Sequence, residues 1–121
     1  MNCKHWRRGI GVIERVRIGG MDVRIVEDET LDAFGEWWDF KQVIRMAPNL
    51  PPRVWASTLL HESLHAIGDV YGVPISERGV RVLEQSIVGM VRADPAGARL
   101  WLEAVIGGDV EGKGPGDSLR L

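Results

Sequence analysis

The stretch that decides the fold of this chain reads Thr58-Leu59-Leu60-His61-Glu62-Ser63-Leu64-His65-Ala66-Ile67. On an α-helix, residues at positions i and i+4 lie one turn apart on the same face. His61 and His65 have this spacing, so both imidazoles can reach one metal ion. Glu62 projects from nearly the same edge, where it can reach a metal-bound water without being a ligand. The pattern His-Glu-x-x-His is typical of zinc metallopeptidases, in which the glutamate is the general base.

Chance is the competing explanation, because a five-residue pattern occurs now and then and a lone helical histidine is usually an ordinary core or surface residue. The apolar flanks, among them Leu60 and Leu64, predict that the helix is buried. Burying two histidines and a glutamate costs free energy unless a metal or hydrogen bonds satisfy them. We therefore interpret the stretch as a metal site.

The composition of the whole chain is that of one ordinary globular domain. It has 121 residues, of which 45% are hydrophobic and 26% are charged, enough for a core without disulfides. The net charge of -2 gives no reason to expect nucleic acid or a membrane surface as a partner. Cys3 is the single cysteine, so no internal disulfide can form. With no membrane-spanning stretch and no signal-peptide pattern in the sequence, we expect a cytoplasmic protein.

The N-terminal half is predicted to form a small antiparallel sheet of about three strands. Two strands are expected within residues 10–27, joined by a turn at Gly19-Gly20, and a third over residues 41–46. A short helix is predicted over residues 31–34. The aromatic run over residues 37–40 is interpreted as core or as a hairpin turn.

Three helices are predicted to follow. The first carries the His-Glu pattern over residues 54–71, Ser76 is expected to cap the second, and Asp94 the third. Five apolar residues of the second helix have the spacing of a buried face: Val80, Leu83, Ile87, Met90 and Val91.

These elements together predict an α+β fold with a single domain over residues 1–108. Residues 109–121 are rich in glycine and charge, and we expect a disordered tail there. Residues 1–9 are basic and polar, and they are interpreted as a loose terminal segment. Cys3 and His5 within that segment are candidate ligands of a second metal, which is the less favoured interpretation.

The third zinc ligand is left open by the spacing. Catalytic zinc usually has three protein ligands, and the candidates that follow His65 are Asp69, Glu77 and Glu84. Asp69 lies one turn beyond His65, where it suits a hydrogen bond to an imidazole better than direct ligation. Glu77 and Glu84 are seven residues apart on the next helix. A simple antiparallel helix pair brings Glu84 level with the histidines, whereas crossed packing brings Glu77.

The chain resembles the small phage-associated HExxH proteins that are grouped near the ImmA/IrrE-type metallopeptidases. The resemblance is carried by residues 58–67, 76–83 and 91–95. The order of elements over residues 12–105 is similar too. The resemblance implies a zincin-like core of three helices, with Glu77 as the third ligand because it precedes Val80 and Leu83. The position of Glu84 is more often small in that family.

The function expected from these features is that of a zinc-dependent endopeptidase acting on a protein or peptide substrate. Zn²⁺ is held by His61, His65 and Glu77, and Glu62 takes the proton of the attacking water. The resemblance also implies an edge strand at residues 41–46 that pairs with an extended substrate. The alternative is a non-catalytic, metal-braced protein-binding module of a phage or mobile element, whose site would close its fourth position with a protein ligand.

Overall fold

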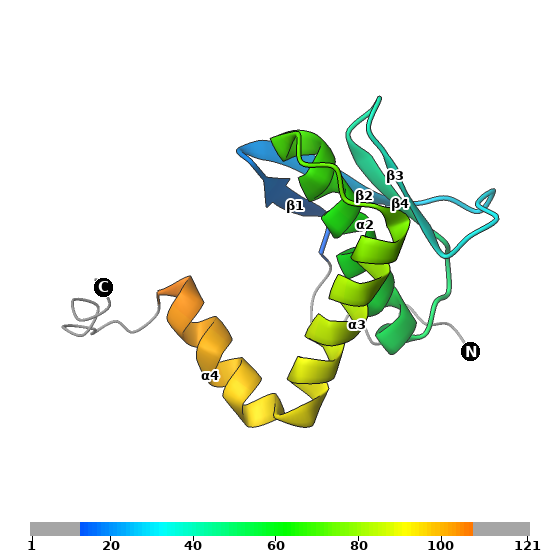
Figure 1. Cartoon of the computed structure of the whole chain (residues 1–121). Helices are drawn as coiled ribbons and strands as arrows, with labels where there is room; N and C mark the ends of the chain where they lie inside the picture. The colour runs from blue at the N-terminus through cyan, green and yellow to red at the C-terminus, as the bar shows by residue number, and fades with distance from the viewer. Residues whose placement is uncertain (1–12, 108–121) are drawn as a thin grey trace. The chain divides into compact units, whose positions relative to one another are not determined.

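The computed structural model describes residues 13–107, in which four strands are followed by three helices (Figure 1). The elements are β1 (Arg15–Ile18), β2 (Met21–Glu27), β3 (Gly35–Trp38), β4 (Val43–Met46), α2 (Pro52–Tyr71), α3 (Glu77–Ala93) and α4 (Pro95–Ile106). The predicted α+β class is confirmed. The chain divides into two compact units, one ending at Glu84 and the other beginning at Gln85. None of the helices within the described residues is long and apolar enough to cross a bilayer.

The sheet has four strands in the order β1-β2-β4-β3, so the prediction of about three antiparallel strands was wrong. Two pairs, β1 with β2 and β3 with β4, are antiparallel, but β2 and β4 run parallel. The parallel pairing places β4 inside the sheet and β3 at its edge. The expectation that residues 41–46 form an edge strand was therefore also wrong, because β4 has a hydrogen-bonded neighbour on both sides.

The predicted hairpin at the start of the sheet is confirmed. Ile18 pairs with Met21, and Gly19 and Gly20 between them have φ angles of 58° and 80°. Two consecutive left-handed residues form the tight turn whose twist matches that of the flanking strands. Glycine adopts this conformation without a steric cost.

The short helix predicted over residues 31–34 is absent, and the chain forms a bend there. The carboxylate of Asp28 accepts hydrogen bonds from both the backbone N–H and the hydroxyl of Thr30, at 2.9 and 2.6 Å. This local turn competes with helix formation, and four residues are too few to offset the cost of helix nucleation. At the end of the bend, the Ala47 N–H donates to the Phe34 carbonyl, which extends the pairing of β3 with β4.

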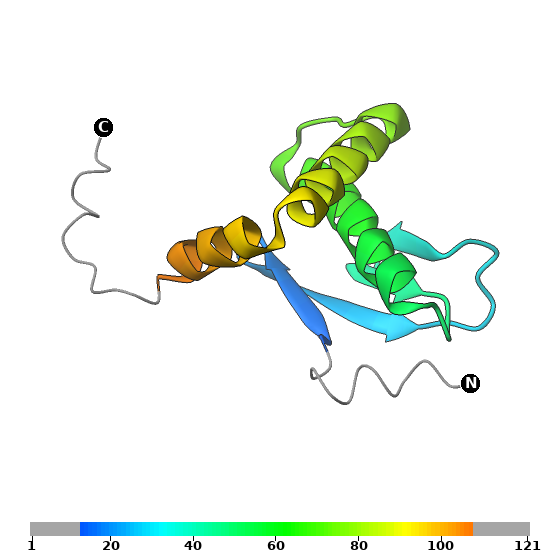
Figure 2. The same cartoon turned by 90° about the horizontal axis from the view of Figure 1, so that it is seen from below.

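Helix α2 packs along one face of the sheet (Figures 1 and 2). The strand register puts alternate apolar side chains on that face, where Ile44 and Met46 are fully buried. Burying side chains of this size contributes about 1.5–3 kcal/mol each. The core cluster consists of Ile18, Val23, Ile44, Met46, Leu50, Trp55 and Ala66.

Strand β3 approaches α2 closely, and a glycine allows it to do so. A Cβ on Gly35 would lie 2.6 Å from Thr58 Cγ2 and 3.2 Å from Glu62 Cγ, so a larger residue would push the strand from the helix. Further along the same strand, the Trp37 indole N–H donates to Asp69 at 2.6 Å. These contacts place the edge of the sheet beside Glu62.

The predicted helix ends are confirmed to within two residues. Helix α2, predicted over residues 54–71, begins at Pro52 and ends at Tyr71, and Gly72 caps it in a left-handed conformation with a φ of 68°. The Ser76 hydroxyl accepts the Gly79 N–H at 3.0 Å, and the Asp94 carboxylate accepts the Gly97 N–H at 3.0 Å. Each cap satisfies a backbone donor that has no partner within its own helix.

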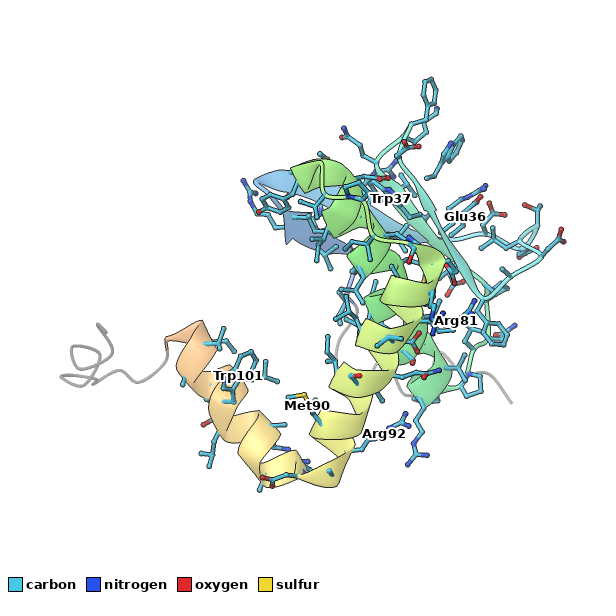
Figure 3. The ribbon with its side chains drawn as sticks, in the orientation of Figure 1. Glu36, Trp37, Arg81, Met90, Arg92 and Trp101 are labelled. Atoms are coloured by element: carbon cyan, nitrogen blue, oxygen red, sulfur yellow. The ribbon has the colours of Figure 1, made fainter. Side chains whose placement is uncertain are left out.

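The prediction of a buried apolar face along the second helix was largely wrong. On α3 only Val80 is buried, whereas Met90 is 73% exposed. Helix α4 has no buried residue, and its Trp101 is 65% exposed (Figure 3). Periodicity indicates which residues share a helix face, but burial also requires another element to cover that face. The remaining predicted residues of that face, Leu83, Ile87 and Val91, are exposed too.

Three expectations concern residues outside those that the structure describes. They are the loose segment over residues 1–9, the second metal site at Cys3 and His5, and the disordered tail over residues 109–121.

The approach of β3 to α2 makes a prediction about Gly35. We expect Gly35→Ala to destabilise the protein by about 1–3 kcal/mol, because the new methyl group overlaps Thr58 Cγ2. Thr58→Ser removes that atom and should recover much of the loss in the double variant. Urea denaturation of the single and double variants measures both effects.

Gly89→Ala is the matched control, because a Cβ there meets no atom within 4 Å and the residue is helical. It should be neutral or stabilising by up to about 1 kcal/mol. Equal stability of the Gly35→Ala variant and the wild type would contradict the close packing of β3.

Candidate metal centre

Three predicted site residues come together where α2 turns back into α3. His61 and His65 lie on α2, and Glu77 is the first residue of α3. One ligand atom from each lies within 4.8 Å of the others, so the three could hold a metal ion. The chain packs closely at this turn. The Val73 carbonyl is so near Gly68 that a Cβ there would lie only 2.9 Å from its oxygen. A larger residue at Gly68 would displace the chain that returns Glu77 to the histidines.

The carboxylate of Glu77 already reaches both imidazoles, one with each of its oxygens. Glu77 Oε1 lies 2.8 Å from His65 Nε2, and Glu77 Oε2 lies 3.2 Å from His61 Nε2. Around a tetrahedral zinc ion with bonds of about 2.0–2.1 Å, neighbouring ligand atoms are roughly 3.3 Å apart. Two imidazole nitrogens and one carboxylate oxygen are also a ligand set of zinc peptidases. The residues present therefore fit a zinc ion.

Glu77 and Glu84, the two glutamates between which the sequence did not decide for the third ligand, both contact His61. They do so at different atoms of the ring. Glu77 contacts Nε2, whereas Glu84 Oε1 lies 3.0 Å from Nδ1. Glu84 is not one of the three residues that could hold the ion. The other oxygen of Glu84 accepts a hydrogen bond from the Ser57 hydroxyl at 2.6 Å.

Glu62 lies beside the triad without belonging to it. Its side chain is buried, and its carboxylate accepts the backbone N–H of Trp37 on β3. Burial raises the pKa of Glu62, and the positive charges of His61 and His65 and the Trp37 N–H offset this increase only in part. A raised carboxylate pKa moves its proton affinity towards the neutral range, where a general base is most effective.

The other titratable groups of the site stabilise one another's charged forms. Burial lowers the pKa of His61, but the hydrogen bond to Glu84 and the charges of Glu62 and Glu77 leave it raised overall. Burial raises the pKa of Glu77 and that of Glu84, yet their hydrogen bonds leave both lowered. Three carboxylates thus surround two imidazoles, and the excess negative charge favours a cation in the triad.

Several residues of the site were missed in the sequence or assigned another role. Arg81, labelled on α3 in Figure 3, donates to Glu77 Oε2 at 3.1 Å, and its i+4 spacing from Glu77 was the available signal. Ser57 has the same spacing ahead of His61. Asp69 was expected to contact an imidazole, but its carboxylate accepts the Trp37 indole N–H and so holds β3 on α2.

Comparison with known proteins found no family model, no curated protein and no solved structure that matches the chain. The comparisons therefore give no support to the resemblance to ImmA/IrrE-type metallopeptidases, which stays a prediction.

The geometry of the triad predicts about one zinc ion per chain. His61→Ala and His65→Ala should abolish binding, because each removes a ligand and leaves two. Glu77→Gln should weaken binding by more than the roughly 10- to 100-fold typical of losing a partner that only orients a ligand. Elemental analysis gives the zinc content, and competition with a chelator gives the affinity.

Glu29→Gln is the control for these measurements, since it makes the same chemical change at an exposed acid between β2 and β3. Its zinc affinity should equal that of the wild type. A wild-type protein that contains no metal after dialysis against zinc would contradict the site.

Proposed function

We propose that this protein is a zinc-dependent metallopeptidase that hydrolyses peptide bonds in a protein or peptide substrate. The observation that carries the proposal is the position of Glu62. Its carboxylate is buried, has a raised pKa and lies next to a group of three residues that could hold a metal, without being one of them. A metal site that only stabilised the fold would not require a buried carboxylate beside its ligands.

The zinc ion would be held by His61, His65 and Glu77. The chemistry that zinc supplies when bound is a lowered pKa for the attacking water and a polarised substrate carbonyl. Glu62 accepts the proton of the water as the new C–O bond forms at the carbonyl carbon. It then returns that proton to the amine nitrogen as the C–N bond breaks. The backbone N–H of Trp37 holds the Glu62 carboxylate in place through both steps.

An extended substrate has an edge available in β3 rather than in β4. Hydrogen-bonded pairs alternate along antiparallel strands, and the bond from the Ala47 N–H to the Phe34 carbonyl sets the phase. The backbone groups of Gly35 and Trp37 therefore point away from β4. The Trp37 N–H already donates to Glu62, which leaves the Trp37 carbonyl and both backbone groups of Gly35 for a substrate. We propose that a peptide pairs with this outer edge, which would bring its scissile bond beside Glu62.

A non-catalytic, metal-braced protein-binding module is the second candidate. Exposed apolar side chains on α3 and α4, such as Met90 and Trp101, favour it, because large exposed apolar residues often contact other proteins. In that case the metal would only link α2 to α3, and Glu62 would have no chemical role.

The role of Glu62 predicts the behaviour of Glu62→Gln. Glutamine matches glutamate in size but cannot accept a proton at neutral pH, so peptidase activity should fall by on the order of 10²- to 10⁴-fold. Zinc content and melting temperature should stay close to those of the wild type. Turnover of a peptide library by the variant, with zinc measured on the same samples, tests this.

Two controls make the result decisive. Wild-type protein stripped by a chelator should be inactive and recover with zinc, and Glu29→Gln should be as active as the wild type. Full activity in zinc-loaded Glu62→Gln would rule out the mechanism. A zinc-loaded wild type that cleaves no peptide of the library would favour the protein-binding module.

A further inference from the structure

The two nitrogens of the His61 ring meet two different carboxylates. Nε2 lies 3.2 Å from Glu77 Oε2, in the triad, and Nδ1 lies 3.0 Å from Glu84 Oε1. Glu77 and Glu84 are seven residues apart on α3, so two helical turns bring both to the same face. One helix therefore contacts the same imidazole at both of its nitrogens.

The carboxylate of Glu84 is itself held in position. The Ser57 hydroxyl donates to Glu84 Oε2 at 2.6 Å, which leaves Oε1 directed at His61. The side chains of Glu84 and His61 are only 20% and 18% exposed, so water competes weakly for these hydrogen bonds. Ser57 lies one turn before His61 on α2, and it contacts the imidazole only through Glu84 in this chain of hydrogen bonds.

A carboxylate that contacts a ring nitrogen dictates the tautomer of a neutral histidine. Both ionised carboxylates can only accept hydrogen bonds, but Glu84 lies closer to the ring, at 3.0 against 3.2 Å, and is 20% exposed where Glu77 is 51% exposed. The single proton of the neutral ring is therefore favoured on Nδ1. The lone pair of the neutral ring is then on Nε2, the nitrogen that faces Glu77. With the opposite tautomer, Nε2 would carry a hydrogen and could not bind a metal.

We propose that Glu84 is a positioning residue of the metal site: it accepts the Nδ1–H of His61 and so presents Nε2 to the ion, while Ser57 fixes Glu84. This inference rests on the metal site of the proposed function. Glu84 thus positions a ligand and does not itself bind the ion, although the sequence indicated it only as an alternative to Glu77 for the third ligand.

The first test compares zinc affinities by chelator competition. Glu84→Gln should bind zinc about 10- to 100-fold more weakly than the wild type, and Glu29→Gln should be unchanged. Ser57→Ala keeps the carboxylate and should show a smaller loss. If Ser57 acts through Glu84, the double variant Ser57→Ala/Glu84→Gln should have the same zinc affinity as Glu84→Gln alone.

The second test observes the tautomer directly, by NMR of ¹⁵N-labelled histidine in alkaline buffer without metal. In the wild type and in Glu29→Gln, His61 should be the Nδ1–H tautomer, with that proton protected from solvent exchange. In Glu84→Gln the protection should be reduced, because an amide oxygen accepts this proton more weakly than a carboxylate, and in Ser57→Ala it should be reduced as well. A general loss of stability would not change one histidine in this way, and Ser57→Ala still supplies the test if Glu84→Gln fails to fold.

Two outcomes would overturn the inference and leave the metallopeptidase proposal intact. They are equal zinc affinity in Glu84→Gln and the wild type, and an Nε2–H tautomer at His61 in the wild type. A wild type that binds no zinc would instead remove the metal site itself, and this inference with it.

Discussion

A carboxylate buried at the junction of a helix and an edge strand is the constraint on which this site depends. Glu62 loses water there, and the Trp37 N–H replaces part of the lost hydrogen bonding. The strand comes close enough only because Gly35 has no side chain to meet Thr58. The same strand–helix contact thus supports the sheet and raises the pKa of the proposed base.

The acidic surroundings of the histidines have a cost in the protein without metal, and that cost falls on Glu62. Contacts with the histidines leave the pKa of Glu77 and of Glu84 lowered, whereas burial and the charge of Glu77 leave the pKa of Glu62 raised. Natural sequences accept such local conflicts chiefly where they are functional. A divalent cation in the triad would turn the excess negative charge from a cost into a source of binding free energy.

Local signals explain what could be predicted from the sequence. Helix α2 was predicted to within two residues because its ends are set by local residues. Pro52 suits the first turn of a helix, and Gly72 adopts the left-handed conformation that ends it. Strand β3 was missed because its aromatic residues were interpreted as core or as a hairpin turn. What makes it a strand is contact with β4 and with Asp69, which is distant in sequence. The choice between Glu77 and Glu84 could not be made from spacing, since it depends on how α3 crosses α2.

The residues that carry the proposed chemistry all lie in the first of the two compact units. The site runs from the edge strand, through Ser57 and the histidines, to Glu84, which is the last residue of that unit. The second unit contributes none of the described site residues, and it carries exposed apolar side chains such as Met90 and Trp101. Because the two sets of residues do not overlap, substitutions at Met90 or Trp101 would leave in place every group that is proposed to bind the metal or to move a proton.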